Sequence, residues 1–110
     1  MILDFHEIPL KTLERFKGGE KHYLAHMFDD GACKIMHGTL IPGATIGVHT
    51  HEDSCEIMYF LSGRGTVIED GVCKEVLPGQ VHYCPKGHTH TLRNDDPAED
   101  LVFIGIVPQQ

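Results

Sequence analysis

The chain has 110 residues, close to the commonest size of one domain, and we expect a single domain over residues 1–110. Its formal net charge is −7, with only 9 lysines and arginines, which argues against a nucleic-acid partner and against docking on an anionic membrane. No apolar stretch approaches the roughly 20 residues of a membrane-spanning helix. The first residues lack a basic start, so we expect a cytoplasmic protein.

Short alternating apolar and polar runs follow one another along the chain, separated by Gly, Pro and Asp. This pattern is typical of an all-β sandwich or barrel. Residues 11–16 contain the only credible helix, and the first 20 residues are the least patterned part of the chain. The predicted strands, in chain order, cover residues 21–28, 33–41, 45–51, 55–61, 64–69, 72–77, 80–84, 88–93 and 101–107.

The cysteines do not have the spacing of a metal or redox motif. They form no Cys-x2-Cys pair and no zinc-ribbon pattern. In a reducing compartment we expect thiols that pack as small apolar side chains. The residues concerned are Cys33, Cys55, Cys73 and Cys84.

Three histidines and one glutamate in the middle of the chain have the types and the spacing of metal ligands. His49 and His51 are two positions apart, so a strand points both side chains to the same face. Glu56 opens the next predicted strand and can lie beside this pair, whereas His90 stands far along the chain. Only a closed sheet would bring His90 opposite the others. Taken alone, His-x-His more often marks two polar residues on a solvated strand face.

Glycine and proline frame these four residues in two blocks. Residues 43–63 read Gly-x5-His-x-His-x4-Glu-x6-Gly, and residues 79–94 read Gly-x5-Pro-x-Gly-x2-His-x3-Asn. Both blocks resemble the two motifs of the cupin family at every defining position, and the 15 residues between them are similar to the spacers of small bacterial cupins. The resemblance implies an all-β fold, the double-stranded β-helix (jelly-roll) cupin barrel. It also implies that His49, His51, Glu56 and His90 hold one metal ion.

Three imidazoles and one carboxylate suit a divalent transition metal, namely Mn, Fe, Ni, Co, Cu or Zn, and the ligand set does not choose among them. Four protein ligands on an octahedral ion leave two positions for water, a bidentate substrate or dioxygen. The ion and Glu56 together carry about one positive charge, which favours an anionic or enolisable small molecule.

Two further histidines have sequence positions near the metal motif. His88 shares strand parity with His90, which allows it to point inward, where it could act as a catalytic general base or support a ligand. The alternative is a turn histidine at the barrel rim. His82 lies in a predicted strand next to Tyr83, and a structural role explains it best.

Several other residues are candidates for the wall of the pocket. By comparison with similar small cupins, we expect Met36 and Phe103 to face the metal, although plain core packing would also explain them. Lys34 and Arg64 are the nearest candidates for holding an anion, and both could equally be surface charges.

Two functions fit this sequence. The first is a metal-dependent enzyme that acts on a small organic substrate, of the dioxygenase, isomerase or decarboxylase type. The second is a non-catalytic module that binds or senses a small molecule beside a bound divalent metal. In either case the resemblance implies a homodimer that pairs through edge strands and N-terminal segments, since an open sheet edge needs cover.

Overall fold

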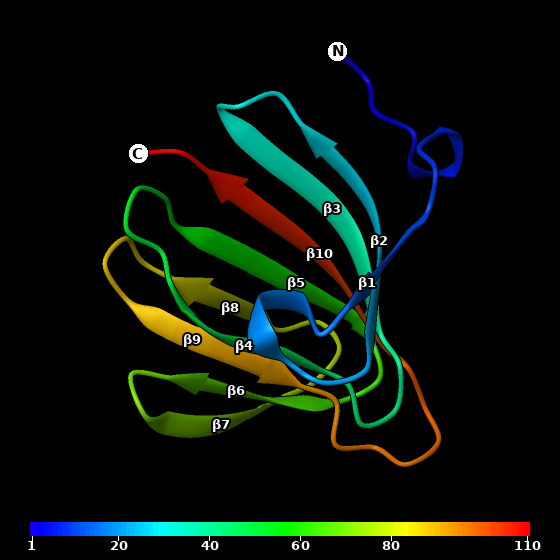
Figure 1. Cartoon of the computed structure of the whole chain (residues 1–110), viewed down its shortest axis with the longest axis vertical. Coiled ribbons are helices and arrows are strands. Elements are labelled where there is room, and N and C mark those ends of the chain that lie inside the picture. Colours follow the sequence, from blue (N-terminus) through cyan, green and yellow to red (C-terminus); the bar gives the residue numbers. More distant parts are fainter.

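The computed structural model describes residues 1–110 and consists of ten strands in two facing sheets, with two short 3-10 helices (Figure 1). The all-β prediction is confirmed. The helices are η1 (Phe5–Glu7) and η2 (Phe16–Gly18). The strands are β1 (Lys11–Glu14), β2 (His22–Asp29), β3 (Cys33–Leu40), β4 (Thr45–Thr50), β5 (Glu56–Ser62), β6 (Gly65–Glu69), β7 (Val72–Val76), β8 (Val81–Cys84), β9 (Thr89–Arg93) and β10 (Leu101–Pro108).

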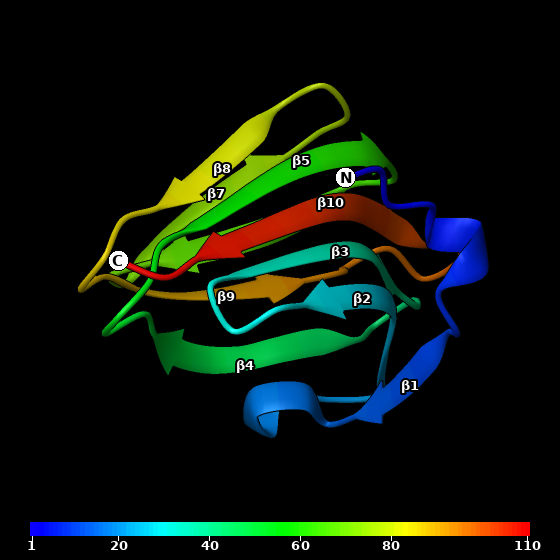
Figure 2. The same cartoon turned by 90° about the horizontal axis from the view of Figure 1, so that it is seen from above.

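The chain crosses repeatedly from one sheet to the other. The larger sheet has the order β1-β2-β3-β10-β5-β8, and the smaller one has the order β4-β9-β6-β7. All pairings within the two sheets are antiparallel. Figure 2 shows the larger sheet from above, with β10 between β3 and β5. No helix in the structure has the length and apolar character needed to cross a membrane.

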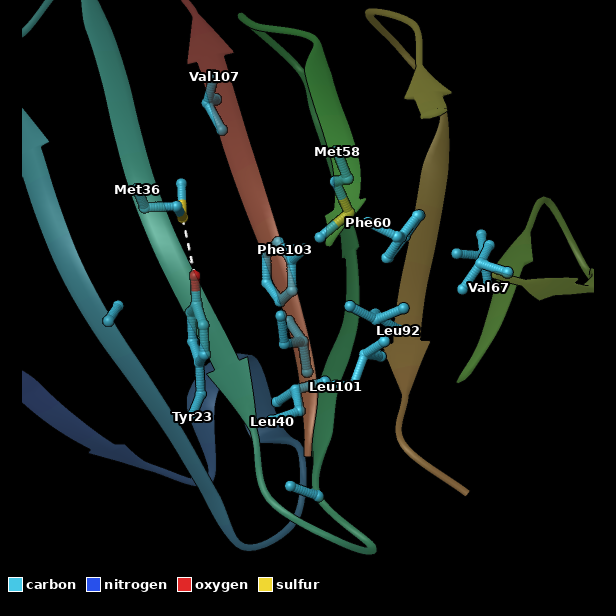
Figure 3. Close-up of a cluster of buried hydrophobic side chains, with 14 residues drawn as sticks. Tyr23, Met36, Leu40, Met58, Phe60, Val67, Leu92, Leu101, Phe103 and Val107 are labelled. Atoms are coloured by element: carbon cyan, nitrogen blue, oxygen red, sulfur yellow. Dashed lines mark hydrogen bonds between the residues drawn. The ribbon is translucent and has the colours of Figure 1, made fainter. Parts of the chain in front are cut away.

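Alternation along the strands places one face of each sheet in the core. In β10 the residues Leu101, Phe103, Gly105 and Val107 are buried, and the residues that alternate with them are less so. Figure 3 shows these side chains packed with those of β2, β3 and β5. Tyr23 crosses this cluster, and its hydroxyl donates to the sulfur of Met36 at 2.9 Å. The core therefore reaches from one end of the sheets towards the middle of the barrel.

The predicted helix at residues 11–16 is wrong. Lys11–Glu14 forms the edge strand β1, which pairs with β2 from Ala25 to His22. A helix of one and a half turns has almost no internal hydrogen bonds to offset the cost of nucleation. Pairing with β2 gives these residues backbone partners, and Leu13 packs against the core. The strand ends at Glu14, and the backbone of the next residue, Arg15, is left-handed with φ of 50°.

Candidate metal centre

An extra residue in β4 sets the direction of the first two histidines. Ile46 is buried and lies opposite Leu92 of β9, whereas His49 lies opposite His90, so β4 takes three steps where β9 takes two. This is a β-bulge, and it shifts the inward face of β4 by one residue. Without it, regular alternation from Ile46 would turn Val48 inward and His49 outward. Val48 is instead 70% exposed.

The other two residues of the motif approach from both sheets. His90 lies on β9 beside His49, and Glu56 begins β5 in the larger sheet. Glu56 shares the inward face of β5 with Met58 and Phe60, which are both buried. The two sheets thus bring together side chains that are up to 41 positions apart along the chain.

The ligand atoms of His49, His51, Glu56 and His90, called the His/Glu cluster below, converge on one point. His90 Nε2 is 2.9 Å from His51 Nε2 and 3.1 Å from His49 Nε2. Glu56 Oε1 is 3.1 Å from the Nε2 atoms of both His51 and His90. One Nε2 carries at most one proton, so hydrogen bonds cannot satisfy every one of these close approaches.

The opposite ring nitrogen of each histidine already has a partner. His49 Nδ1 lies 2.8 Å from the carbonyl oxygen of Gly47, and His51 Nδ1 lies 3.0 Å from Ser54 Oγ. His90 Nδ1 lies 3.0 Å from a third partner, the Nε2 atom of His82. A carbonyl oxygen can only accept, so His49 carries its proton on Nδ1 and presents the Nε2 lone pair to the cluster.

A divalent cation fits the spacing of the His/Glu cluster. Ligand atoms about 2.1 Å from an ion and at right angles to one another lie about 3.0 Å apart. The separations of 2.9 and 3.1 Å match this geometry. Imidazole nitrogens and one carboxylate are ligands that Mn, Fe, Ni, Co, Cu and Zn accept. The cluster could therefore hold one such ion and leave positions open towards solvent.

Electrostatics favour the metal-binding protonation state of two members of the cluster, Glu56 and His49. Burial raises the pKa of Glu56, but hydrogen bonds from His51 and His90 and the charges of these rings outweigh burial and lower that pKa to about 2. Burial also lowers the pKa of His49, against the opposing effect of its bond to Gly47. At neutral pH Glu56 is therefore a carboxylate and His49 a neutral imidazole, the forms that coordinate metals.

A cavity of about 270 Å³ opens onto the His/Glu cluster. This is slightly below the range of about 300–1,000 Å³ that is common for ligand pockets, so it suits a small organic molecule. Tyr23 and Met36 form part of an apolar wall. Lys17 and Lys34 also line the cavity. Glu52 and Asp53 add exposed carboxylates at the rim.

The loop around η2 supplies one wall of this cavity. Phe16 and Lys17 line it because the loop backbone lies directly on β4. A Cβ atom on Gly47 would clash with the carbonyl oxygen of Lys17, and one on Gly19 would clash with that of Thr45. Only glycine allows two backbones to approach so closely.

Of the predicted wall residues, some face the cavity and others do not. Met36 lines the cavity, as expected. Lys34, a candidate for holding an anion, lines it too. Phe103 was expected to face the metal, but its ring is fully buried in the core and stacks on Tyr23 at a centroid distance of 5.8 Å. Arg64 is also elsewhere, 3.4 Å from Asp96 in a surface ion pair.

His88 does not point inward and is instead the turn histidine of the alternative considered for it. His88 precedes β9, its side chain is 44% exposed, and its Nδ1 lies 2.6 Å from Asp70 Oδ2 and 3.3 Å from Glu69 Oε2. The parity rule failed because residues 85–88 belong to a turn, where side chains do not alternate. The catalytic role proposed for His88 stays a prediction.

His82 is the residue that sequence reasoning undervalued. It lies on β8 with only 9% of its side chain exposed, and its Nε2 contacts His90 Nδ1. His82 lies inside the second sequence block, residues 79–94, but it is not one of the defining positions of that block. The apolar residue expected at an inward strand position is replaced here by histidine, and that substitution was the available signal.

The cysteines behave as predicted, because all four are free thiols. Cys84 is buried near His82 and His90. Burial raises the pKa of its thiol to about 12, so it stays protonated at neutral pH and is a poor metal ligand.

Comparison with known proteins shows which family has this fold. Residues 36–107 match the model of the family described as Cupin domain, which covers both sequence blocks. The chain belongs to the cupin family. The predicted jelly-roll architecture of this cupin is therefore confirmed, and the His/Glu cluster falls on the positions where the family resemblance implied metal ligands.

Relatives of this cupin cover nearly its whole length. An oxalate-binding protein from Thermotoga maritima is 28% identical over 116 residues, which cover 97% of this chain and 93% of that protein. A predicted oxalate decarboxylase from Thermotoga maritima has a TM-score of 0.91 at 24% identity, with 100% of both chains covered. A cupin sugar phosphate isomerase from Silicibacter pomeroyi has a TM-score of 0.79 at 18% identity, covering 100% of this chain and 76% of its own. At these identities the two structures show the fold alone.

Proposed function

We propose that this cupin binds a small organic dianion of the oxalate type through one divalent metal held by the His/Glu cluster. The observation that carries the proposal is the convergence of three imidazole nitrogens and one carboxylate oxygen, with separations of 2.9 to 3.1 Å, at a cavity of about 270 Å³. The metal, when bound, supplies a Lewis-acidic centre with open positions for two oxygen atoms of the ligand.

Charge favours an anion in this cavity. A divalent ion and the Glu56 carboxylate together retain about one positive charge in a partly buried place, where electrostatic interactions are strong. Lys17 and Lys34 line the same cavity, but Glu52 and Asp53 line it too, so these side chains balance in charge and the metal supplies the attraction for an anion. The relative named oxalate-binding protein supports a dicarboxylate as the class of ligand.

The cavity favours binding over catalysis. Apart from the His/Glu cluster, the ionisable side chains that line it are two lysines, two exposed carboxylates and the Tyr23 phenol. Burial raises the pKa of Tyr23, and its hydroxyl is occupied with Met36, so it is a weak acid catalyst. His88, the predicted general base, does not line the cavity and is bonded to Asp70. No group is thus poised to transfer protons to a bound ligand.

A metal-dependent enzyme is the second candidate. It is favoured by the arrangement of the cluster at the bottom of an open cavity, where four protein ligands leave coordination positions that a substrate can reach. In that case the reaction would depend on the metal and on groups that the ligand itself brings.

The test measures metal and ligand binding in sequence. Purified protein is analysed for metal by mass spectrometry, stripped with a chelator, reloaded with Mn(II) or Zn(II), and titrated calorimetrically with oxalate. We expect one ion per chain and oxalate binding only to the loaded form. His51→Ala should weaken metal binding by more than about 100-fold, since even the loss of a partner behind a ligand costs 10–100-fold. His37→Ala, on the outer face of β3, is the matched control.

The outcomes separate the two candidates. Oxalate that is recovered unchanged after long incubation with loaded protein supports a binding module. Loss of oxalate with time, followed by carbon-13 NMR, supports the enzyme. Stoichiometric metal in His51→Ala, or oxalate binding to the stripped protein, would overturn the proposed site.

We propose in addition that two copies of this cupin associate through the outer face of the larger sheet. The outward residues of β10, β5 and β8 are all apolar or aromatic, and none carries a charge. They are Ile57, Tyr59, Leu61, Val81, Tyr83, Val102, Ile104 and Ile106. In a chain with a net charge of −7, an uncharged face is where a second copy can approach with least repulsion.

A further inference from the structure

His82 contacts the His/Glu cluster from behind. Its strand β8 is the edge of the larger sheet, and its side chain points inward next to His90 of the smaller sheet. The two rings are joined by one short contact, 3.0 Å between His82 Nε2 and His90 Nδ1. His82 is therefore the only residue of the larger sheet, besides Glu56, that has a polar contact with the cluster histidines.

A metal on His90 would fix the protons of both rings. A neutral imidazole that gives its Nε2 lone pair to an ion carries its proton on Nδ1. His90 Nδ1 must then donate, and His82 Nε2 must accept. Because His82 is neutral in this arrangement, its own proton lies on Nδ1. His82 Nδ1 faces the carboxylate of Glu69 at 3.9 Å.

The three cluster histidines differ in what holds their Nδ1 atoms. His49 has a backbone carbonyl oxygen and His51 has the hydroxyl of Ser54, both of which are close in sequence to the ring that they hold. His90 depends on a side chain from the opposite sheet. Like that of His51 and unlike that of His49, its orientation depends on a side chain that a single substitution can remove.

A second cavity continues this chain of contacts to solvent. It has a volume of about 640 Å³ and is lined by residues of β6, β7 and β8 and of the turns beside them. Glu69, Gln80 and His82 are among the residues that line it. The separation of 3.9 Å between His82 Nδ1 and Glu69 Oε1 is too long for a direct hydrogen bond, and Glu69 Oε2 lies 3.3 Å from His88 Nδ1.

We propose that His82 is a positioning residue for the metal centre, which accepts a hydrogen bond from His90 Nδ1 and so holds the His90 ring and tautomer in the form that binds metal. The charge of the Glu69 carboxylate, 3.9 Å from His82 Nδ1, favours a proton on that nitrogen. The inference rests on the proposed function, because it requires that the His/Glu cluster binds a metal.

The mutational test compares three variants of the full chain with the wild type. His82→Leu removes the acceptor, His82→Gln replaces His82 Nε2 with an amide that can accept, and His37→Leu removes a histidine from the outer face of β3 as a control. Affinity for Zn(II) and Co(II) is measured by competition with a chelator. We expect His82→Leu to bind 10–100-fold more weakly, about the cost of losing a partner behind a ligand. His82→Gln should recover most of the loss, and His37→Leu should match the wild type.

A spectroscopic measurement on the wild type keeps the test independent of how the variants fold. In the Zn(II)-loaded protein, nitrogen-15 NMR of the histidine rings should find protons on Nδ1 of both His82 and His90. A proton on His82 Nε2 would overturn the inference, because that nitrogen could not accept from His90.

The failure of this inference can be told apart from failure of the proposed function. Wild-type protein that binds no divalent metal would overturn both. Wild-type protein that binds metal, together with a His82→Leu variant of equal affinity, would overturn only the role of His82. A His82→Gln variant that is folded and as weak as His82→Leu would also overturn it, because the hydrogen bond would then not be the cause.

Discussion

For single residues, the decisive property of this site is which ring nitrogen of each histidine carries the proton. Gly47 O and Ser54 Oγ lie at the Nδ1 atoms of His49 and His51, and all three cluster histidines turn Nε2 towards the same point. The sequence identifies the four residues but not these outer partners, because backbone carbonyls leave no pattern of residue types. The same limit applies to His82 and His88. Their partners, His90 and Asp70, come from other elements of the fold, which the sequence does not place.

Buried neutral histidines predict how the metal-free protein responds to acid. Burial is the first cause that lowers the pKa of both His49 and His82 below the ordinary value of 6.5. In the unfolded chain these rings take up protons near pH 6.5, whereas in the folded chain they resist until lower pH. Unfolding therefore binds protons in this window, and the free energy of unfolding should fall as pH drops through 6.5.

This prediction is checked by urea unfolding of chelator-treated protein at a series of pH values from 7 to 5. Each proton taken up on unfolding contributes a slope of up to about 1.4 kcal/mol per pH unit. His49→Gln should flatten the slope, and His6→Gln, in a side chain that is 97% exposed, should not. A free energy of unfolding that does not change over this range would contradict the burial of these rings.

Among the strands, β4 shows how far a pattern of alternation can be trusted. His49 and His51 do share a face, as their spacing predicts, but Ile46 faces the same way at odd spacing from them. The bulge that reconciles these positions depends on Gly47 and on the loop that lies against it, and periodicity alone cannot detect it. Residues 11–16 show a second limit of periodicity. Their partner strand β2 follows a loop with left-handed residues, and the pattern of residue types does not reveal this pairing.

A larger residue at position 47 should disturb the bulge and the loop together. We expect Gly47→Ala to destabilise the protein by about 1–3 kcal/mol, because the added methyl group meets the backbone of Lys17, which cannot rotate away. Val48→Ala, at the exposed neighbouring position, is the matched control. Thermal and urea unfolding measure the difference, and equal stability of the two variants would contradict the close packing of η2 on β4.

At the scale of the whole molecule, the fold class and the positions of the strands can be predicted from the sequence. Regularly spaced strands with Gly, Pro and Asp turns predict the all-β class, and nine of the ten strands overlap a predicted one. The pairing order does not follow from periodicity, because β10 lies between β3 and β5 and its partners are remote in sequence. The jelly-roll topology came from the resemblance of two motifs, and the family match confirms it.

The outer face of the larger sheet leads to a prediction about assembly. Ile104 lies at the centre of β10, between Tyr59 of β5 and His37 of β3. If two copies associate through this face, sedimentation equilibrium at micromolar concentration should give twice the mass of one chain. Ile104→Glu should give monomers, since it would bury an unpaired charge at the contact.

Val72→Glu provides the control for the assembly experiment. Val72 is 58% exposed on β7 of the smaller sheet, away from the proposed contact, so this variant should remain dimeric. A wild-type protein that sediments only as a monomer would remove the proposal. Two variants that dissociate equally would assign the contact to another surface.

The central place of β10 has a consequence for biosynthesis. β3 and β5 are synthesised before residues 101–108, and until these are added each has a strand edge without its neighbour. The larger sheet can close only after translation of this segment, so nascent chains carry two adhesive edges for a time. Cellular chaperones that shield such edges would then matter more for the yield of this protein than for its final stability.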